Sequence, residues 1–266
     1  MIRFRFMAIA FGQLWFDEVA TPPMPDILIL RHSRTRPESG PISTKRSLLT
    51  DLTKPEEQLW ESIGKTCRYK IRRAETKDGV KCFVNLVPSI VGVNEFADFY
   101  DRFARQKSLS PINPRRFAAM AHAGRLRVSR AEINENAVVR HAYVTAGRAV
   151  RLIYSASFYR DVDAETRAVI GRANRLLHWR DMISFKAGGF DQLDWGGLFA
   201  DESAPDRRGI NDFKREFGGT PMDYFDGYRA CSLLGRTVLQ LASLVVHAKQ
   251  LVGKPRFKSP PAHEVV

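Results

Sequence analysis

Two short segments in the last third of the chain combine residue types suited to group transfer. The first, GINDFKREFGG (209–219), places Lys214 directly after Phe213, and the second, DWGG (194–197), begins with Asp194. An ammonium group can stabilise a developing oxyanion, and a carboxylate can orient an amine or accept its proton. Spacing alone also allows plainer interpretations, in which Lys214 is an exposed charge at a helix end and Asp194 stabilises a turn.

The elements that must position these residues predict a mixed sheet. Three runs rich in β-branched residues (125–133, 137–144 and 148–157) are separated by NEN and AG, which predicts an antiparallel meander. An apolar stripe at helical spacing predicts a long helix over 164–186, and a strand with a glycine turn follows over 190–197. This order is typical of an α+β or mixed α/β layer rather than of a doubly wound parallel fold.

The rest of the chain adds flanking elements. Thr53 is expected to cap a helix with an apolar stripe from Leu59 to Ala74, and Asn94 to cap the next helix. We also expect an edge strand within 6–16, strands at 26–32, 46–52, 80–87 and 222–230, a loop at 34–45, helices at 114–121, 212–217 and 233–251, and a disordered tail over 252–266.

Composition favours a basic globular protein. Lys and Arg number 42 against 29 Asp and Glu, a net charge of +13, which suits nucleic acid, anionic lipid or phosphate-bearing substrates. Three distant cysteines without a CxxC pair, and six scattered histidines, predict neither disulfides nor a metal site and favour a reducing cytoplasm. No run of 18 apolar residues exists, so no membrane span is expected.

Three segments together resemble FemAB-type transferases. These are LWESIGKTCRYKIRRAETKDGV (59–80), NRLLHWRDMISFKAGGFDQLDWGG (174–197) and GINDFKREFGG (209–219). The resemblance implies a GNAT-like acyltransferase with a twisted mixed sheet, related to the aminoacyltransferases that build peptidoglycan bridges. It implies transfer of an acyl or aminoacyl group to an amine on a peptidoglycan or surface-glycan precursor. The chain looks like a short, single-lobe member, and the lack of a full first lobe puts the glycyl-bridge activity itself in doubt.

The resemblance also implies roles for individual residues. The lysine of the family's Phe-Lys motif is thought to act electrostatically on the reacting carbonyl, and this role falls on Lys214, with Asp194 as its catalytic partner. The remaining residues that we expect to bind substrate are Phe213, Trp195, Gly196, Gly197, Arg68, Arg72 and Tyr154. For Trp195, packing in the core is the alternative to stacking on a ligand.

The resemblance implies acyl-CoA or aminoacyl-tRNA as the donor, used as a co-substrate, and we expect no tightly bound cofactor. The CoA signal is poor, because Arg167 and Gly171 are one residue too far apart for a pyrophosphate loop and lie within a predicted helix. The basic segment 65–81, with seven Lys and Arg against two acids, suits a tRNA backbone or a lipid- or nucleotide-linked envelope precursor. A solvated helix face is the plainer interpretation.

We expect a reduced first lobe over 1–50, a GNAT-like domain over 51–230, and an amphipathic helix with a tail over 231–266. The last helix is either buried against the sheet or attached to the inner face of the membrane, through its broad apolar stripe and basic residues. The alternative function is a non-catalytic protein that binds RNA or a membrane surface and keeps the fold.

Overall fold

A computed structural model describes residues 1–37, 41–159 and 162–251 of the chain, with side chains up to residue 243. The strands of this part are β1 (Ile2–Phe6), β2 (Ile9–Trp15), β3 (Ile27–Ser33), β4 (Ile42–Asp51), β5 (Lys81–Asn85), β6 (Leu126–Ile133), β7 (Asn136–Ala146), β8 (Ala149–Ser157), β9 (Gln192–Gly197) and β10 (Thr220–Ala230). They form one sheet of ten strands in the order β1-β2-β3-β10-β4-β9-β8-β7-β6-β5. The expected mixed α/β class with an antiparallel β6–β7–β8 meander is confirmed.

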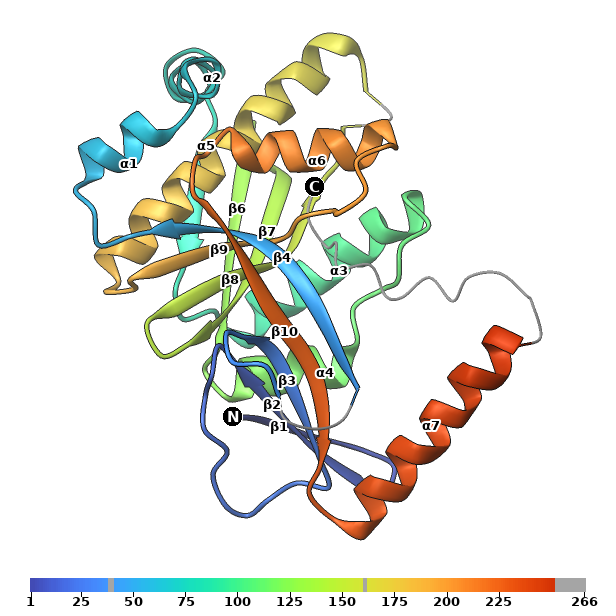
Figure 1. Ribbon diagram of the computed structural model, residues 1–266. Coiled ribbons are helices and arrows are strands. Elements are labelled where there is room, and N and C mark those ends of the chain that lie inside the picture. Colours follow the sequence, from blue (N-terminus) through green and yellow to red (C-terminus); the bar gives the residue numbers. More distant parts are fainter. Residues whose placement is uncertain (38–40, 160–161, 252–266) are drawn as a thin grey trace.

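Helices cover both faces of the sheet (Figure 1). They are α1 (Glu56–Ser62), α2 (Lys65–Thr76), α3 (Ile90–Gln106), α4 (Pro114–His122), α5 (Ala164–Ala187), α6 (Pro205–Arg215) and α7 (Leu233–Leu251). One apolar core joins α1, α2, α5 and the end of α6 to the sheet, and a second core joins α3 and α4 to the opposite face. All nine residues of β8 are buried, as expected for a strand that is covered on both sides.

The alternation of side chains along β8 and β9 places two polar residues on the face of the sheet opposite α5. Leu193 and Trp195 belong to the core beneath α5, so Asp194 between them points to the other face. On β8, Val150 and Leu152 belong to that same core, and Arg151 therefore lies on the same face as Asp194. Two charged side chains thus meet in the interior of the sheet.

The two strands that carry these charges separate immediately after them. Parallel pairing of β8 with β9 ends at the pair formed by Arg151 and Asp194. Beyond this pair, β8 continues beside β7 to Ser157, whereas β9 continues beside β4 to Gly197. Arg151 and Asp194 therefore lie at the closed end of a splay between neighbouring strands.

The first strands differ from expectation. The N-terminal residues form the β1–β2 hairpin rather than one edge strand, because Met7 adopts a left-handed conformation (φ 53°) that reverses the chain. β4 begins at Ile42, inside the expected loop 34–45, where it pairs with Gly227 of β10. Pairing partners this distant in sequence leave no local signal.

The helix expected to begin at Thr53 is two helices. Gly64 is extended (φ −56°, ψ 141°) and separates α1 from α2, and its N–H donates to the carbonyl oxygen of Glu216 at 2.8 Å. The hydroxyl of Thr53 instead donates to Asp51 at 2.6 Å, so Thr53 is not the cap. A contact from a distant helix end thus determines where this apolar stripe is interrupted.

Two smaller expectations are also wrong. Ser89, not Asn94, caps α3, because its Oγ accepts the N–H of Gly92 at 3.2 Å and the helix begins at Ile90. Residues 196–197 are the end of β9 rather than a separate turn. Gly196 has a φ of 81°, so the glycine is used for a bend within the strand.

None of the helices in the described ranges is both long and apolar enough to cross a membrane. The expected tail, 252–266, lies outside the described residues. The division into 1–50, 51–230 and 231–266 stays a prediction, although the sheet itself is continuous because β10 lies between β3 and β4.

Candidate functional site

Lys214 lies on the inner face of α6 and is fully buried. Its Nζ donates to the carbonyl oxygen of Gly197 at 2.5 Å. Burial lowers the pKa of Lys214 to about 7, the Arg151 guanidinium adds to this shift, and the Asp194 carboxylate opposes it. The interpretation of Lys214 as an exposed charge at a helix end is therefore wrong. Lys214 follows Asn211 by three positions, so both residues lie on the buried face of α6.

Asp194, on β9, is also fully buried. Its Oδ1 accepts hydrogen bonds from the Ser47 hydroxyl, from the Arg151 guanidinium at 2.7 Å and from the Gly196 backbone N–H at 2.8 Å. Burial raises the pKa of this carboxyl, but Arg151, His32 and these hydrogen bonds outweigh burial and hold the pKa below its usual value. Oδ2 has no hydrogen-bond partner among the described residues. Asp194 is thus an ionised carboxylate with one unoccupied oxygen.

The hydrogen bond from Gly196 to Asp194 is the one that the turn-stabilising interpretation predicts. A purely local role does not account for the other partner, since Arg151 is buried and forms an ion pair with the same oxygen at 2.7 Å. Asp194 therefore stabilises its own strand end and also holds a buried cation beside the splay.

The N-terminal strands supply a second layer of polar groups. The buried ring of His32 lies 5.1 Å from that of Tyr224 on β10, and its backbone N–H donates to Asp226 at 2.9 Å. Burial lowers the pKa of His32, with Arg151 adding to the shift. Burial, with a contribution from Asp194, raises the pKa of the Tyr224 hydroxyl to about 12. Both side chains therefore stay uncharged beside Arg151 and Asp194 at neutral pH.

His178 of α5 is buried on the Lys214 side of the site. Its ring lies 5.2 Å from Trp195, 5.5 Å from Phe213 and 5.4 Å from Phe217, measured between ring centres. Burial lowers the pKa of His178 well below its usual value, and the charge of Lys214 contributes to the same effect. An uncharged imidazole enclosed by aromatic rings thus forms the wall above the ammonium group.

A buried hydrogen-bond network continues from His178 into the core. His141 lies between Asp181, 2.7 Å from its Nδ1, and Asn174, 2.8 Å from its Nε2, and Tyr143 donates to Asp181 at 2.6 Å. Burial, with Asp181 adding to the shift, raises the pKa of Tyr143 well above its usual value. The network joins the meander to α5 beneath the site and fixes the position of His178.

His141, His178 and Asp181 bring three potential metal ligands close together. The two imidazole rings, however, are stacked with centres 3.9 Å apart and planes 21° apart. Ring nitrogen lone pairs lie in the ring planes, so nearly parallel stacked rings cannot direct them at one ion. This arrangement suits a hydrogen-bonded network better than a metal centre.

The other expected site residues are divided. Phe213 is half-buried and lies beside Lys214, with the Arg175 guanidinium 4.8 Å above its ring. Gly196 and Gly197 offer backbone groups to Asp194 and Lys214. Trp195 is a core residue, whose ring stacks on Phe217 and whose Nε1 donates to Thr50 at 2.8 Å. Trp195 therefore packs in the core, which is the alternative that we gave to stacking on a ligand.

Three other expected residues contact Trp60 or the core beneath α3. Arg68 is half-buried on α2 and reaches the carbonyl oxygen of Trp60 at 3.4 Å, while exposed Arg72 lies 5.2 Å above the Trp60 ring. Tyr154 packs against Tyr100 at 4.6 Å in the core beneath α3. Tyr154 faces this core because a register irregularity next to its partner Ala142 shifts the alternation of β8.

Sequence reasoning missed Arg151, Ser47 and His178. Arg151 left a signal, because it is the one charge inside AVRLIYSAS (149–157), a strand otherwise apolar enough to be buried on both faces. His178 lies on the long helix three residues before Asp181, a spacing that puts the two on one face. Ser47 left no signal, since only the β4–β9 pairing brings it to Asp194.

No protein-family model matches the sequence, and no curated protein matches it. Among solved structures, the fold matches FemX with a TM-score of 0.54 at 14% identity, over 74% of this chain and 63% of that chain. It also matches the C-terminal domain (DUF2156) of a lysylphosphatidylglycerol synthetase from Agrobacterium fabrum, with a TM-score of 0.51 at 12% identity, over 86% of this chain and 74% of that chain.

A weaker match is a GCN5-related N-acetyltransferase from Kribbella flavida, with a TM-score of 0.38 at 14% identity, over 78% of this chain and 70% of that chain. The match to FemX covers less than two thirds of FemX. The resemblance to FemAB-type transferases is confirmed at the level of the fold.

Proposed function

We propose that this protein transfers an acyl or aminoacyl group to an amine on a cell-envelope precursor. The observation that carries the proposal is the burial of Lys214 within the field of Asp194 and Arg151, next to the point where β8 and β9 separate. A lysine at such a place has a free energy cost that packing alone does not repay. The fold shared with FemX and with a lysylphosphatidylglycerol synthetase domain supports the same class of reaction.

In this reaction the acceptor nitrogen attacks the acyl carbon and a C–N bond forms. The C–O bond of an ester donor or the C–S bond of a thioester donor breaks, and the proton of the amine ends on the leaving oxygen or sulfur. The ammonium form of Lys214 stabilises the negative charge that develops on the carbonyl oxygen. Low local polarity strengthens this interaction, because Phe213, Phe217 and His178 keep water from the ammonium group.

Asp194 orients the attacking amine through its free Oδ2. Its lowered pKa makes it a weak proton acceptor at neutral pH, so the structure favours the orienting role over that of a general base. Arg151 keeps the carboxylate ionised and fixes its position. An aminoacyl-tRNA or an acyl-CoA is the donor, and a lipid- or nucleotide-linked envelope precursor is the acceptor.

Contact with an anionic membrane is part of the proposal. Six large apolar side chains are exposed near the start of α7, namely Phe6, Met7, Met24, Leu233, Leu234 and Leu241. Asp26 joins the segments that carry them, because it accepts the Ala10 N–H at 2.8 Å and the Ser232 hydroxyl at 2.6 Å. We call these six residues the apolar foot.

Exposed arginines surround the apolar foot. They are Arg5, Arg229 and Arg236. Figure 1 shows α7 leading away from the sheet, and Leu233, Leu234 and Leu241 on this helix are exposed. Apolar side chains among cations are the combination that enters the interface of an anionic bilayer, where a lipid-linked acceptor would lie. The interpretation of this helix as buried against the sheet does not fit Leu233, which is 80% exposed.

A transfer assay tests the function. The purified protein is incubated with a pool of labelled aminoacyl-tRNAs or with labelled acyl-CoAs, together with an extract of amine-bearing envelope precursors. We expect label to move into a precursor from one of the two donor classes, and Asp194→Asn to reduce that movement. RNA or vesicle binding without any transfer from either donor would favour the non-catalytic alternative instead.

A further inference from the structure

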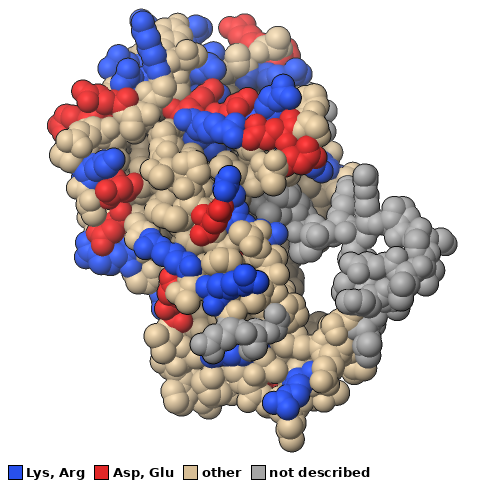
Figure 2. Space-filling view, viewed as in Figure 1, with Lys and Arg blue, Asp and Glu red and all other residues tan. Residues whose placement is uncertain are grey.

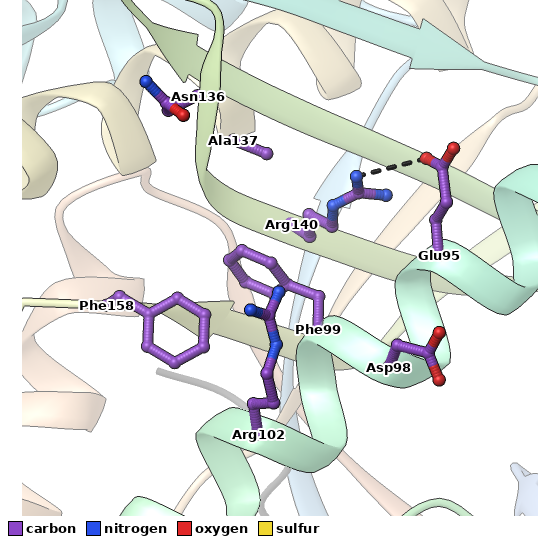
Figure 3. Close-up of a pocket in the computed structure, with 8 residues that line it drawn as sticks. All are labelled: Glu95, Asp98, Phe99, Arg102, Asn136, Ala137, Arg140 and Phe158. Carbon is purple, nitrogen blue, oxygen red and sulfur yellow. Dashed lines mark hydrogen bonds and ion pairs between the residues drawn. The ribbon is translucent and has the colours of Figure 1, made fainter.

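A second hollow lies on the face of the sheet opposite Lys214. It is formed between α3 and the adjoining ends of β7 and β8, and its volume is about 420 Å³ (Figure 3). Its floor is the ring of Phe99, which contacts Phe158 edge-on with the ring centres 4.6 Å apart. Nothing in the proposed transfer reaction uses this hollow, so its chemistry needs an account of its own.

One arginine of the hollow, Arg102, has no acidic partner in the part of the chain that the structure describes. The guanidinium of Arg102 lies 5.8 Å from the centre of the Phe99 ring and 5.5 Å from that of Phe158. Among the described residues, no carboxylate lies within ion-pairing distance of Arg102. In Figure 3 the carboxylate of Asp98 points away from it. Stacking leaves the edge of a guanidinium, where its N–H groups are, free for an anion.

The second arginine is largely buried and only partly satisfied. The side chain of Arg140 is 14% exposed and lies 5.5 Å above Phe99, and its Nη2 donates to Glu95 at 3.2 Å. Its Nε is buried and has no hydrogen-bond partner among the described residues. A buried donor without an acceptor is unfavourable, and an oxygen of a ligand would supply the missing hydrogen bond.

We propose that this hollow binds a small amphoteric molecule, an amino acid or a short peptide. Its carboxylate accepts hydrogen bonds from Arg102 and from Nε of Arg140, which match a carboxylate well because of their planar, forked donors. Its ammonium group lies beside the Glu95 carboxylate, and its apolar side chain lies against Phe158. The volume is within the usual range for small-molecule sites.

Three probes that differ by one charged group test this assignment. They are L-phenylalanine, L-phenylalaninamide, which lacks the carboxylate, and N-acetyl-L-phenylalanine, which lacks the ammonium group. We expect calorimetry on the full chain to show that L-phenylalanine binds at least about tenfold more tightly than either analogue, a difference of about 1.4 kcal/mol. Equal affinity for L-phenylalanine and either analogue overturns the amphoteric assignment.

Arg102→Ala localises the binding. Arg102 is exposed, so the fold is retained, and the substitution is expected to weaken binding about tenfold or more. Arg207→Ala is the matched control, because Arg207 is also exposed and also lies over a phenylalanine, 5.5 Å from the Phe199 ring. If the two variants bind L-phenylalanine alike, the proposal is wrong. The readout is heat of binding, so this result is independent of whether the protein transfers an acyl group.

Discussion

Lys214 is a buried cation that forms no ion pair among the described residues. Its Nζ has a backbone carbonyl as its hydrogen-bond partner, and the nearest influences on its charge are Arg151, which repels it, and Asp194, which attracts it. Two cations and one carboxylate therefore share a dry interior. Such an arrangement destabilises the fold, and proteins retain it where a reacting group needs it.

This burial predicts a pH-dependent stability. The pKa of Lys214 is about 7 in the folded protein and 10.5 as the ordinary value, so the unfolded chain binds more protons between these two pH values. The contribution of Lys214 to the stability of the wild type should be constant below about pH 7 and become more favourable above it, by up to about 1.4 kcal/mol per pH unit. Lys214→Met, which keeps the packing, should lack this rise.

Urea unfolding of both proteins at pH 6, 7 and 9 measures the effect. The difference between the ordinary and the lowered pKa of Lys214 corresponds to about 5 kcal/mol. Below pH 7 the Met variant should therefore be more stable than the wild type by a few kcal/mol. The gap should narrow by roughly 2 kcal/mol between pH 7 and pH 9. Taking the difference removes the other titrating groups, so parallel stability curves would mean that Lys214 is charged normally.

At the residue scale, the sequence allowed prediction of Lys214 and Asp194 but not of their environment. The Phe-Lys and Asp-Trp-Gly-Gly segments are local and recognisable, whereas Ser47 reaches Asp194 through pairing of distant strands. The expectation that Lys214 is exposed was wrong, because the charge pattern of a six-residue segment does not reveal which face of a short helix packs inward.

At the scale of elements, α6 depends on how it ends. Glu216, directly after the helix, pairs with Arg175 of α5 at 2.6 Å, and its carbonyl accepts the N–H of Gly64. The chain then turns sharply into β10 through Gly218 and Gly219, both with positive φ. These contacts hold the helix at the angle that brings Lys214 to Gly197.

A pair of Gly→Ala substitutions tests this ending. A Cβ on Gly219 would lie 2.8 Å from the carbonyl oxygen of Leu49 at a φ of 101°, whereas a Cβ on Gly209, within α6, would meet nothing within 4 Å. Gly219→Ala should cost about 2 kcal/mol or more in the free energy of unfolding. Gly209→Ala should add about 0.5–1 kcal/mol, because alanine is the better helix former. If chemical denaturation shows that both substitutions change the free energy of unfolding in the same direction, the account is contradicted.

The α7 element and the β1–β2 hairpin predict binding to anionic vesicles. Replacing Met7 and Leu233 together by Ser removes two exposed side chains of the apolar foot and should reduce sedimentation with phosphatidylglycerol vesicles. Added salt should weaken binding of the wild type, since each surrounding arginine contributes roughly 1 kcal/mol that is screened.

The control replaces Val87 and Ile90 by Ser. Both are exposed apolar residues away from the apolar foot, Val87 between β5 and α3 and Ile90 at the first position of α3. Vesicles of phosphatidylcholine alone supply the uncharged comparison. A wild type that stays in the supernatant at low salt, or two double variants that bind equally, would exclude the apolar foot as the contact.

Periodicity predicted the elements whose own sequence determines them. The long helix α5 and the β6–β7–β8 meander begin and end within a few residues of expectation. Expectations failed where a contact from elsewhere decides, as when Gly64 divides α1 from α2 against the end of α6. The N-cap of α3 was also predicted at the wrong residue. Ser89 and Asn94 are both suitable capping residues near one apolar run, and the helix begins after Ser89.

At the scale of the whole molecule, the N-terminal strands complete the site. β10 inserts between β3 and β4, which brings His32 and Tyr224 next to the buried charges. Pairing across nearly two hundred residues is invisible to local patterns, so the sequence could not predict that β3 pairs with β10 and that the first strands share one sheet with the β6–β7–β8 meander. Figure 2 shows acidic and basic side chains intermixed on the visible face, so the positive charge is not one continuous patch there.

The central claim is that buried Lys214 promotes acyl transfer by stabilising the charge on the reacting carbonyl oxygen. One comparison of two lysine variants tests this claim most directly. Lys186 is the matched control, because it also lies at a helix end and donates to a backbone carbonyl, that of Leu52 at 3.0 Å. Rates of label transfer are measured for Lys214→Met and Lys186→Met with the donor that the wild type uses. The account predicts a loss of about 10²–10³-fold for the first variant and little change for the second. Equal rates in the two variants would contradict it.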